Sequence, residues 1–255
     1  MTAADDLLAH ELAAEAGERL LKLRAGGGDA TALRQAGDRQ SHEFLTAELA
    51  RLRPGDAVLS EEGADDHARL SARRVWIVDP LDGTREFGEL DRTDWAVHVA
   101  LWTAESSSPS HLTAGAVALP AQGMVLSTAE PVARQAPVPA RPRFVVSRTR
   151  PPALSAALAE QLGADLVPLG SAGAKAAAVI RGEVDAYVHS GGQYEWDSAA
   201  PVAVARAAGL HTSRIDGSPL AYNQAHPSLP DILICEVSLA RPLLAAIAAA
   251  QASPG

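Results

Sequence analysis

The sequence has little cysteine, few aromatic side chains and a deficit of positive charge. Its 255 residues include one cysteine, Cys235, so no intramolecular disulfide can form. Aromatic residues make up 4% of the chain against 47% hydrophobic residues, so a core of this size must be built mainly from aliphatic side chains. With 22 basic and 31 acidic residues, the net charge is −9, which argues against a nucleic-acid polymer as partner.

Long apolar segments are also missing. No uninterrupted apolar run approaches the ~20 residues of a membrane-spanning helix, and the first residues lack the basic and apolar regions of a signal peptide. We therefore expect a cytoplasmic protein with no membrane partner. The 8 histidines show no His-x-x-x-His pair with a nearby acid, so a zinc site is not predicted.

The hydrophobic pattern alternates between the periods of helices and strands. The predicted helices cover residues 5–24, 40–52, 152–162, 171–181, 198–208 and 239–250. The predicted strands cover residues 57–59, 75–78, 95–102, 113–119, 122–128, 144–147, 184–189 and 231–236. Such alternation is typical of α/β layering. The Pro- and Ala-rich segment 129–143 predicts a join between two halves, 1–135 and 136–255, of one domain.

The most informative segment follows the strand predicted at residues 75–78. It places Asp79 at the strand end and Asp82 three residues later, across a turn. Two such carboxylates, with the Leu81 carbonyl between them, can share magnesium ions, which take oxygen ligands. If a helical turn begins at Gly83 and Thr84, their amides can hold a phosphate oxygen. The alternative is an ordinary Asp-rich turn.

Two further acidic segments support the first interpretation. Glu61 and Glu62 follow a short apolar step, so their carboxylates are expected at another strand end. Asp197 stands at a predicted helix start, with Pro201 in the first turn, where its missing N–H costs nothing. Taken alone, Asp197 is best explained as a helix N-cap. A shared cation site explains all three acidic segments together.

On these residues the chain resembles the inositol monophosphatase superfamily. The stretches Asp79–Thr84 and Trp196–Ala200 look like its two signatures, and the Glu61-Glu62 pair falls where that family keeps an acidic metal ligand. The resemblance spans nearly the whole chain in order and spacing. It implies an α/β fold arranged as a five-layer αβαβα sandwich, two or three Mg²⁺ ions, inhibition by lithium, and a homodimer.

The resemblance also implies roles for individual residues. Asp79 would bridge two ions, and the remaining ligands would come from both halves: Glu61 and the Leu81 carbonyl on one ion, Asp82 and Asp197 on the other. Glu61 and Asp79 thereby also count as catalytic. Thr84 would position the attacking water, and Asp38 would assist it or hold a third ion. The family more often has threonine two or three residues before this aspartate, whereas Gln35 and Ala36 precede it here.

Within the superfamily, Arg85-Glu86-Phe87 after the threonine resembles the CysQ type of 3′(2′),5′-bisphosphate nucleotidase, including actinobacterial sequences of that type. Those enzymes convert 3′-phosphoadenosine 5′-phosphate (PAP) to AMP and phosphate in sulfate assimilation. The resemblance implies a set of substrate-binding residues: Gly83, Thr84, Arg85, Arg148, Ser171, Lys175 and Asp197. Surface positions for the basic residues and a helix cap for Ser171 are the alternatives. Tyr194 and Trp196 either stack on a base or pack in the core.

Other functions remain open at this stage. A phosphatase of the same fold that acts on inositol 1-phosphate or fructose 1,6-bisphosphate is the first alternative. A related phosphatase in a specialised biosynthetic pathway is the second, and a non-catalytic metal- or nucleotide-binding protein is the third. The Arg85-Glu86 pair favours a nucleotide substrate, and the intact acidic positions favour catalysis.

Overall fold

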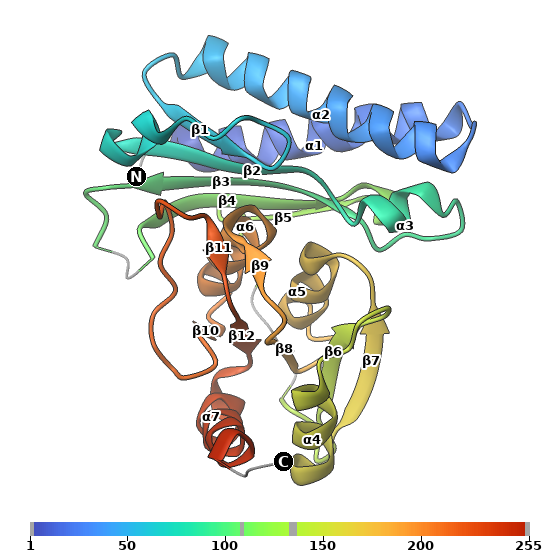
Figure 1. Ribbon diagram of the computed structural model, residues 1–255, viewed down its shortest axis with the longest axis vertical. Coiled ribbons are helices and arrows are strands. Elements are labelled where there is room, and N and C mark those ends of the chain that lie inside the picture. The colour runs from blue at the N-terminus through green and yellow to red at the C-terminus, as the bar shows by residue number, and fades with distance from the viewer. Residues whose placement is uncertain (1–2, 108–109, 133–136, 253–255) are drawn as a thin grey trace.

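The computed structural model describes residues 3–107, 110–132 and 137–252. Helices and sheets of this part of the chain stack in five layers (Figure 1). Helices α1 (Ala3–Ala25) and α2 (Ala30–Leu52) form the first layer, and the first sheet lies beneath them. Helices α5 (Ala172–Ile180) and α6 (Glu195–Ala207) separate that sheet from the second one. The αβαβα prediction is therefore confirmed.

The first sheet contains five strands in chain order: β1 (Ala57–Ser60), β2 (Arg74–Asp82), β3 (Ala96–Thr103), β4 (Leu112–Leu119) and β5 (Met124–Ser127). β1 is parallel to β2, and the later neighbours are antiparallel. Side chains of a strand alternate between its two faces, so Trp76 and Val78 join the core under α1 and α2, whereas Val75 and Ile77 join the core toward α5 and α6. β2 is buried on both faces because helices cover both.

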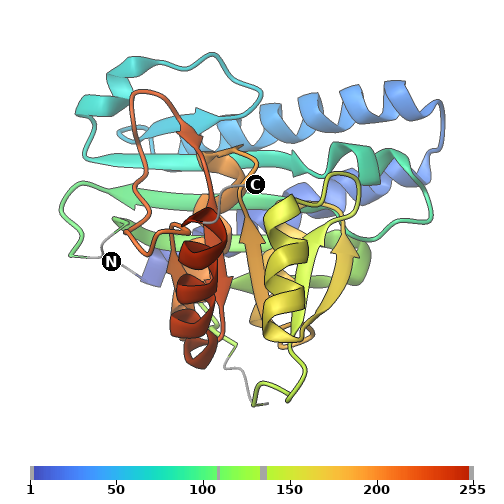
Figure 2. The same cartoon turned by 60° about the horizontal axis from the view of Figure 1, so that its bottom comes forward.

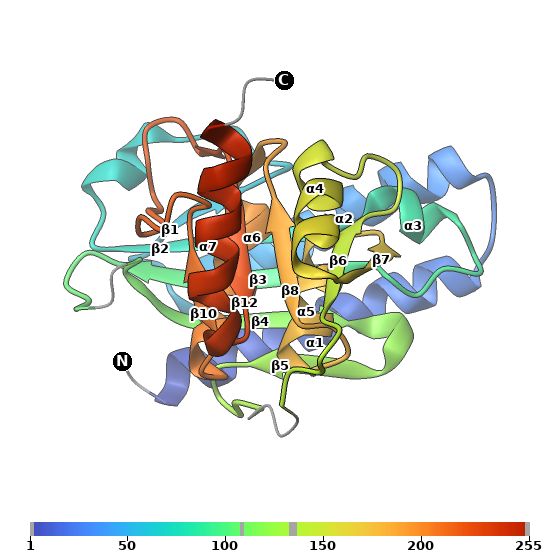
Figure 3. The same cartoon turned by 90° about the horizontal axis from the view of Figure 1, so that it is seen from below.

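The second sheet has the order β10 (His211–Ser213), β12 (Ile232–Cys235), β8 (Ala186–His189), β6 (Arg143–Ser147) and β7 (Asp165–Leu169). Helices α4 (Ala153–Leu162) and α7 (Val237–Ala252) lie side by side on its outer face (Figures 2 and 3). β7 and β10 were not predicted, because β7 is a largely exposed edge strand and β10 has only three residues.

Short elements complete the described chain: α3 (Thr84–Gly88), the 3₁₀ turns η1 (His67–Ser71) and η2 (Pro120–Gln122), and a small antiparallel pair formed by β9 (Gln193–Tyr194) and β11 (Ser228–Leu229). The predicted join at 129–143 runs between β5 and β6, with residues 133–136 outside the described part; residues 108–109 of the polar loop at 105–110 also lie outside it. No helix within the described ranges is long and apolar enough to cross a membrane.

Helix α2 begins at Ala30, ten residues before the predicted start at residue 40. The Asp29 carboxylate caps this earlier start by accepting hydrogen bonds from the N–H groups of Thr31 (2.9 Å) and Ala32 (3.0 Å). Asp38 consequently lies inside the helix. Gly37 lets the helix approach the end of β2, because a Cβ there would stand 2.8 Å from a side-chain atom of Leu81.

Two other boundaries matter for the acidic segments. β2 continues to Asp82, beyond the predicted end at residue 78, and its pairing with β3 shifts register between Asp79 and Asp82. Helix α6 begins at Glu195, three residues before the predicted start. Asp197 is therefore in the first turn of the helix and not its N-cap, and its Oδ2 accepts a hydrogen bond from the N–H of Tyr194 (2.6 Å).

Helix α6 packs on the first sheet at Gly115 of β4. A Cβ at Gly115 would lie 2.6 Å from the Cβ of Ala203 and 3.3 Å from the carbonyl oxygen of Ala200. We predict that Gly115→Ala lowers the free energy of unfolding by about 1–3 kcal/mol through overpacking, measured by urea denaturation. Gly55→Ala, where a Cβ would have no neighbour within 4 Å, is the control. Equal stability of the two variants would contradict this close packing.

Candidate active site

Three aspartates from the two halves of the chain meet between the first sheet and α6. Asp79 and Asp82 lie at the end of β2, and Asp197 lies in the first turn of α6. One carboxylate oxygen from each lies within 4.8 Å of the other two. Asp79 and Asp82 are 1% and 7% exposed. Oxygen donors in such a group suit a hard divalent cation.

Asp79 carries the strongest indication of a missing positive partner. Its Oδ1 accepts the N–H of Leu81 at 3.0 Å. Its Oδ2 is buried and receives no hydrogen bond from an N–H or hydroxyl group of the described residues. Burying a carboxylate oxygen without a partner is costly, and a cation between the three aspartates would satisfy it. The residues present therefore fit a divalent metal ion.

Asp82 is held by the N-terminus of α5. It accepts hydrogen bonds from the Ser171 hydroxyl and from the N–H groups of Ala172 (3.1 Å) and Gly173 (2.6 Å). His98 Nε2 lies 3.2 Å from its Oδ2. Burial alone would raise the pKa of Asp82, but the positive charges of His98 and Lys175 and the Ser171 hydroxyl outweigh it and lower the pKa. Asp82 therefore stays ionised.

Asp79 and Asp197 show the opposite behaviour, and so does Glu61, which lies outside the group of three and keeps an exposed surface. Burial and the charge of Asp197 raise the pKa of Glu61 to about 7. Burial and the charge of Asp82 raise the pKa of Asp197 to about 6. Burial and the charge of Glu61 hold the pKa of Asp79 well above its ordinary value. Like charges in a space shielded from water oppose one another's ionisation, which a cation would reverse.

Thr84 and Asp38 meet beside this cluster. The Thr84 hydroxyl lies 3.2 Å from Asp38 Oδ1 and 3.0 Å from the Leu81 carbonyl oxygen. Burial and the charge of Glu62 raise the pKa of Asp38 to about 6. The early start of α2 is what brings Asp38 to this position.

A cavity of about 390 Å³ opens beside Asp82 and Asp197. Five of the predicted substrate-binding residues line it: Gly83, Arg85, Ser171, Lys175 and Asp197. Arg150 and His189 also line it and had not been predicted as site residues, and Tyr194, for which base stacking was one of two alternatives, lines it as well. The Lys175 ammonium is buried and donates to the carbonyl oxygens of Gly170 (2.9 Å) and Ser171 (2.6 Å). Lys175 thus also holds the turn that leads into α5.

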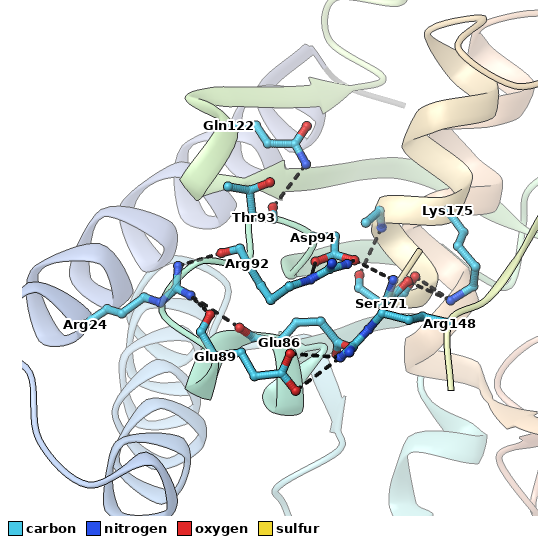
Figure 4. Close-up of polar contacts among 12 residues, drawn as sticks. Arg24, Glu86, Glu89, Arg92, Thr93, Asp94, Gln122, Arg148, Ser171 and Lys175 are labelled. Atoms are coloured by element: carbon cyan, nitrogen blue, oxygen red, sulfur yellow. Dashed lines mark hydrogen bonds and ion pairs between the residues drawn. The ribbon is translucent and has the colours of Figure 1, made fainter. Parts of the chain in front are cut away.

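Arg148 is not among the residues that line this cavity. It forms ion pairs with Glu86 (2.7 Å) and Glu89 (3.1 Å), as Figure 4 shows. In the same network, Arg92 pairs with Asp94, whose Oδ2 accepts the N–H of Gly170 (2.6 Å). These contacts join the segment after β2 to the second half of the chain.

His98 and Tyr194 show what the sequence analysis missed or left open. His98 belongs to no metal-binding spacing, and its only sequence signal is a lone polar residue in the apolar strand predicted at 95–102. The Tyr194 ring is 52% exposed and stacks on Trp196 with ring centroids 4.7 Å apart and planes 9° apart. Trp196 therefore packs against the core, and Tyr194 is open to the cavity.

The layered fold, with an all-oxygen acidic cluster that could hold a divalent cation beside a cavity lined by both acidic and basic residues, defines a class of layered α/β protein. The chain belongs to the inositol monophosphatase family, a family of phosphatases, whose model matches residues 3–251. This confirms the predicted family.

Individual relatives agree with the family assignment. The chain is 54% identical to a 3′-phosphoadenosine 5′-phosphate phosphatase of Mycobacterium bovis, covering 92% of this chain and 90% of the relative. It is 32% identical to an inositol-1-monophosphatase of the same species, covering 83% and 82%. The crystal structure of CysQ from Bacteroides thetaiotaomicron superposes with a TM-score of 0.75 at 25% identity, covering 91% of this chain and 97% of that one.

The raised pKa values predict how the metal-free protein responds to pH. An acid whose pKa is raised by folding binds more protons in the folded state, so its contribution to stability is present at low pH and is lost as pH rises. From the values for Glu61, Asp197 and Asp38, the loss falls between about pH 4 and 7. Asp79→Asn removes one charge of the cluster. We expect this variant, without metal, to gain stability over the wild type as pH rises.

Chemical denaturation in EDTA between pH 5 and 8 measures this difference, with exposed Glu11→Gln as control. Magnesium should stabilise the wild type more at pH 8 than at pH 5, because ligands must be deprotonated, and should have little effect on Asp79→Asn. Parallel pH curves for the wild type and Asp79→Asn would contradict the proposed repulsion.

Proposed function

We propose that this chain is a magnesium-dependent phosphatase that removes the 3′-phosphate of PAP to yield AMP and inorganic phosphate. The observation that carries the proposal is the group of three aspartates, in which Asp79 Oδ2 receives no hydrogen bond from the described residues and lies 4.0 Å from His98 Nδ1, next to a cavity that also presents cationic side chains. The name of the 54% identical mycobacterial relative supports this substrate.

Magnesium would be held by five oxygen donors: Glu61, Asp79, the Leu81 carbonyl, Asp82 and Asp197. We propose that two or three ions would be held at this site. When bound, magnesium supplies Lewis-acid chemistry to the phosphoryl oxygens and to the attacking water. The carboxylates of the chain set where the ions sit, and the repulsion between them favours cation binding.

Thr84 and Asp38 orient the water. At neutral pH Asp38 is ionised, because its pKa is raised only to about 6, and it can accept the hydroxyl hydrogen of Thr84 at 3.2 Å. The Thr84 oxygen then accepts a hydrogen bond from the water and points one lone pair of that water at phosphorus. Gly83, with φ +82, makes the turn that leads into Thr84 and itself lines the cavity.

A nucleotide bisphosphate brings a second phosphate that needs positive charge away from the metals. Arg85 and Arg150 line the cavity and are exposed, and neither guanidinium has an ion-pair partner among the described residues. Arg148 is paired with two glutamates, so we assign Arg150 in its place and keep Arg85. Arginine suits this role because its planar donors match phosphate oxygens.

Tyr194 offers a surface for the base. Its exposed ring is backed by Trp196, and its backbone N–H is bonded to Asp197. The stacking platform is therefore fixed relative to the acidic cluster. Inositol 1-phosphate and fructose 1,6-bisphosphate carry no planar group to stack there, so the platform favours PAP over these alternative substrates, although an inositol-1-monophosphatase is also a relative at 32% identity.

Phosphate release from PAP, inositol 1-phosphate and fructose 1,6-bisphosphate, with and without magnesium, tests the function. We expect phosphate release that depends on magnesium and is fastest with PAP. The Asp82→Asn variant should release phosphate no faster than a reaction without enzyme, while its circular dichroism spectrum shows that it is folded. Equal rates with all three substrates would replace the proposal with a broad phosphatase. No release from any of them, with magnesium bound, would favour a binding protein.

The base platform is tested separately by Tyr194→Ala. Because stacking of a base on an aromatic ring contributes about 1–3 kcal/mol, KM for PAP should rise about 5- to 150-fold, measured at saturating magnesium. Tyr194→Phe keeps the ring and should stay near the wild type. The residual rate on inositol 1-phosphate should not change. A similar loss with both phosphate esters would contradict base stacking.

A further inference from the structure

His98 is a polar side chain in an otherwise aliphatic layer. It lies in β3, directly opposite Asp79 of β2. Its neighbours on the same face of the strand, Ala96 and Ala100, belong to the core between the first sheet and the α5–α6 layer. The side chain is 0% exposed. An imidazole buried to this degree requires polar partners.

The two ring nitrogens of His98 face groups from the two halves of the protein. Nδ1 lies 3.0 Å from the carbonyl oxygen of Trp196, the residue directly before Asp197. Nε2 lies 3.2 Å from Oδ2 of Asp82. Both neighbours are acceptors: Nδ1 lies within hydrogen-bond distance of its carbonyl, whereas Nε2 forms an ion-pair contact with Asp82 and not a well-directed hydrogen bond. One side chain thus connects the carboxylate at the end of β2 with the backbone of the first turn of α6.

Gly173 makes room for this arrangement. A Cβ at residue 173 would stand 2.1 Å from His98 Nε2 and 3.1 Å from Asp82 Oδ2. The Gly173 N–H donates to the same carboxylate oxygen at 2.6 Å. The start of α5 therefore packs against the His98–Asp82 contact at backbone distance.

We infer that His98 is a positioning residue that sets the separation between Asp82 and Asp197. The inference rests on the proposed role of these aspartates in binding magnesium. Asp82 comes from the first sheet and Asp197 from α6, so only noncovalent contacts fix the distance between their carboxylates. Magnesium accepts little departure from octahedral geometry. Loss of the His98 contacts should therefore weaken cation binding before it changes contacts with the substrate.

The test is a calorimetric titration of Mg²⁺ into the substrate-free full chain. His98→Leu removes both nitrogens at similar volume and should weaken Mg²⁺ binding about 10- to 100-fold, the range for groups that orient metal ligands. His98→Gln, whose amide can donate two hydrogen bonds, should recover part of this loss. His10→Leu is the control, because His10 contacts Ser127 (3.1 Å) and no residue of the acidic cluster.

A folded His98→Leu variant with wild-type Mg²⁺ affinity would overturn the inference. If His98→Leu does not fold, His98→Asn, too short to reach both acceptors, decides by the same criterion. At saturating Mg²⁺, KM for PAP should stay within about threefold of the wild type in His98→Gln, and a larger rise would instead place His98 in the substrate pocket. If the wild-type protein does not cleave PAP but His98→Leu still weakens Mg²⁺ binding, the positioning role of His98 is supported and only the proposed substrate is rejected.

Discussion

The structure depends on bringing three aspartates from separate parts of the chain together between the first sheet and α6, where Asp79 and Asp82 are buried and Asp197 is half-buried. Burial and mutual repulsion raise the pKa of Asp79, of Asp197 and of Glu61, which lies outside this group of three and keeps an exposed surface. Such a cluster lowers the free energy of unfolding, which is small for any domain. Burial of the aliphatic layers on both sides of the first sheet must offset this loss, and a bound cation would reduce it.

The protein partly compensates this negative charge with fixed donors. The N-terminus of α5 directs two N–H groups and a hydroxyl at Asp82, and His98 adds a positive charge from β3. These contacts keep Asp82 ionised, whereas Asp79 Oδ2 is left without a donor from the described residues. The cluster thus combines Asp82, whose carboxylate is fixed by hydrogen bonds and orders the site, with Asp79, whose Oδ2 lacks a hydrogen-bond donor and favours a cation.

Polar contacts around this site hold the two halves of the chain together. The ion pairs of Arg148 with Glu86 and Glu89 and the hydrogen bond from Gly170 to Asp94 join the segment after β2 to the turn before α5 (Figure 4). Lys175 closes the same turn from inside. Glu86 and Lys175 also line the cavity, whereas Arg148 does not, so a basic residue close to the cavity can serve the scaffold and not a ligand.

The sequence alone determined the layered α/β class, the family and the three acidic segments, because strand periodicity and the spacing from Asp79 to Thr84 are local properties. It did not determine where α2 and α6 begin, since the Asp29 cap and the Gly37 contact depend on specific backbone geometry. Only the tertiary structure decided that Arg150 and Tyr194 face the cavity, that Arg148 does not line it, and that His98 connects the two halves. The physical reason is that these roles arise from distances between segments far apart in the chain, which no local pattern encodes.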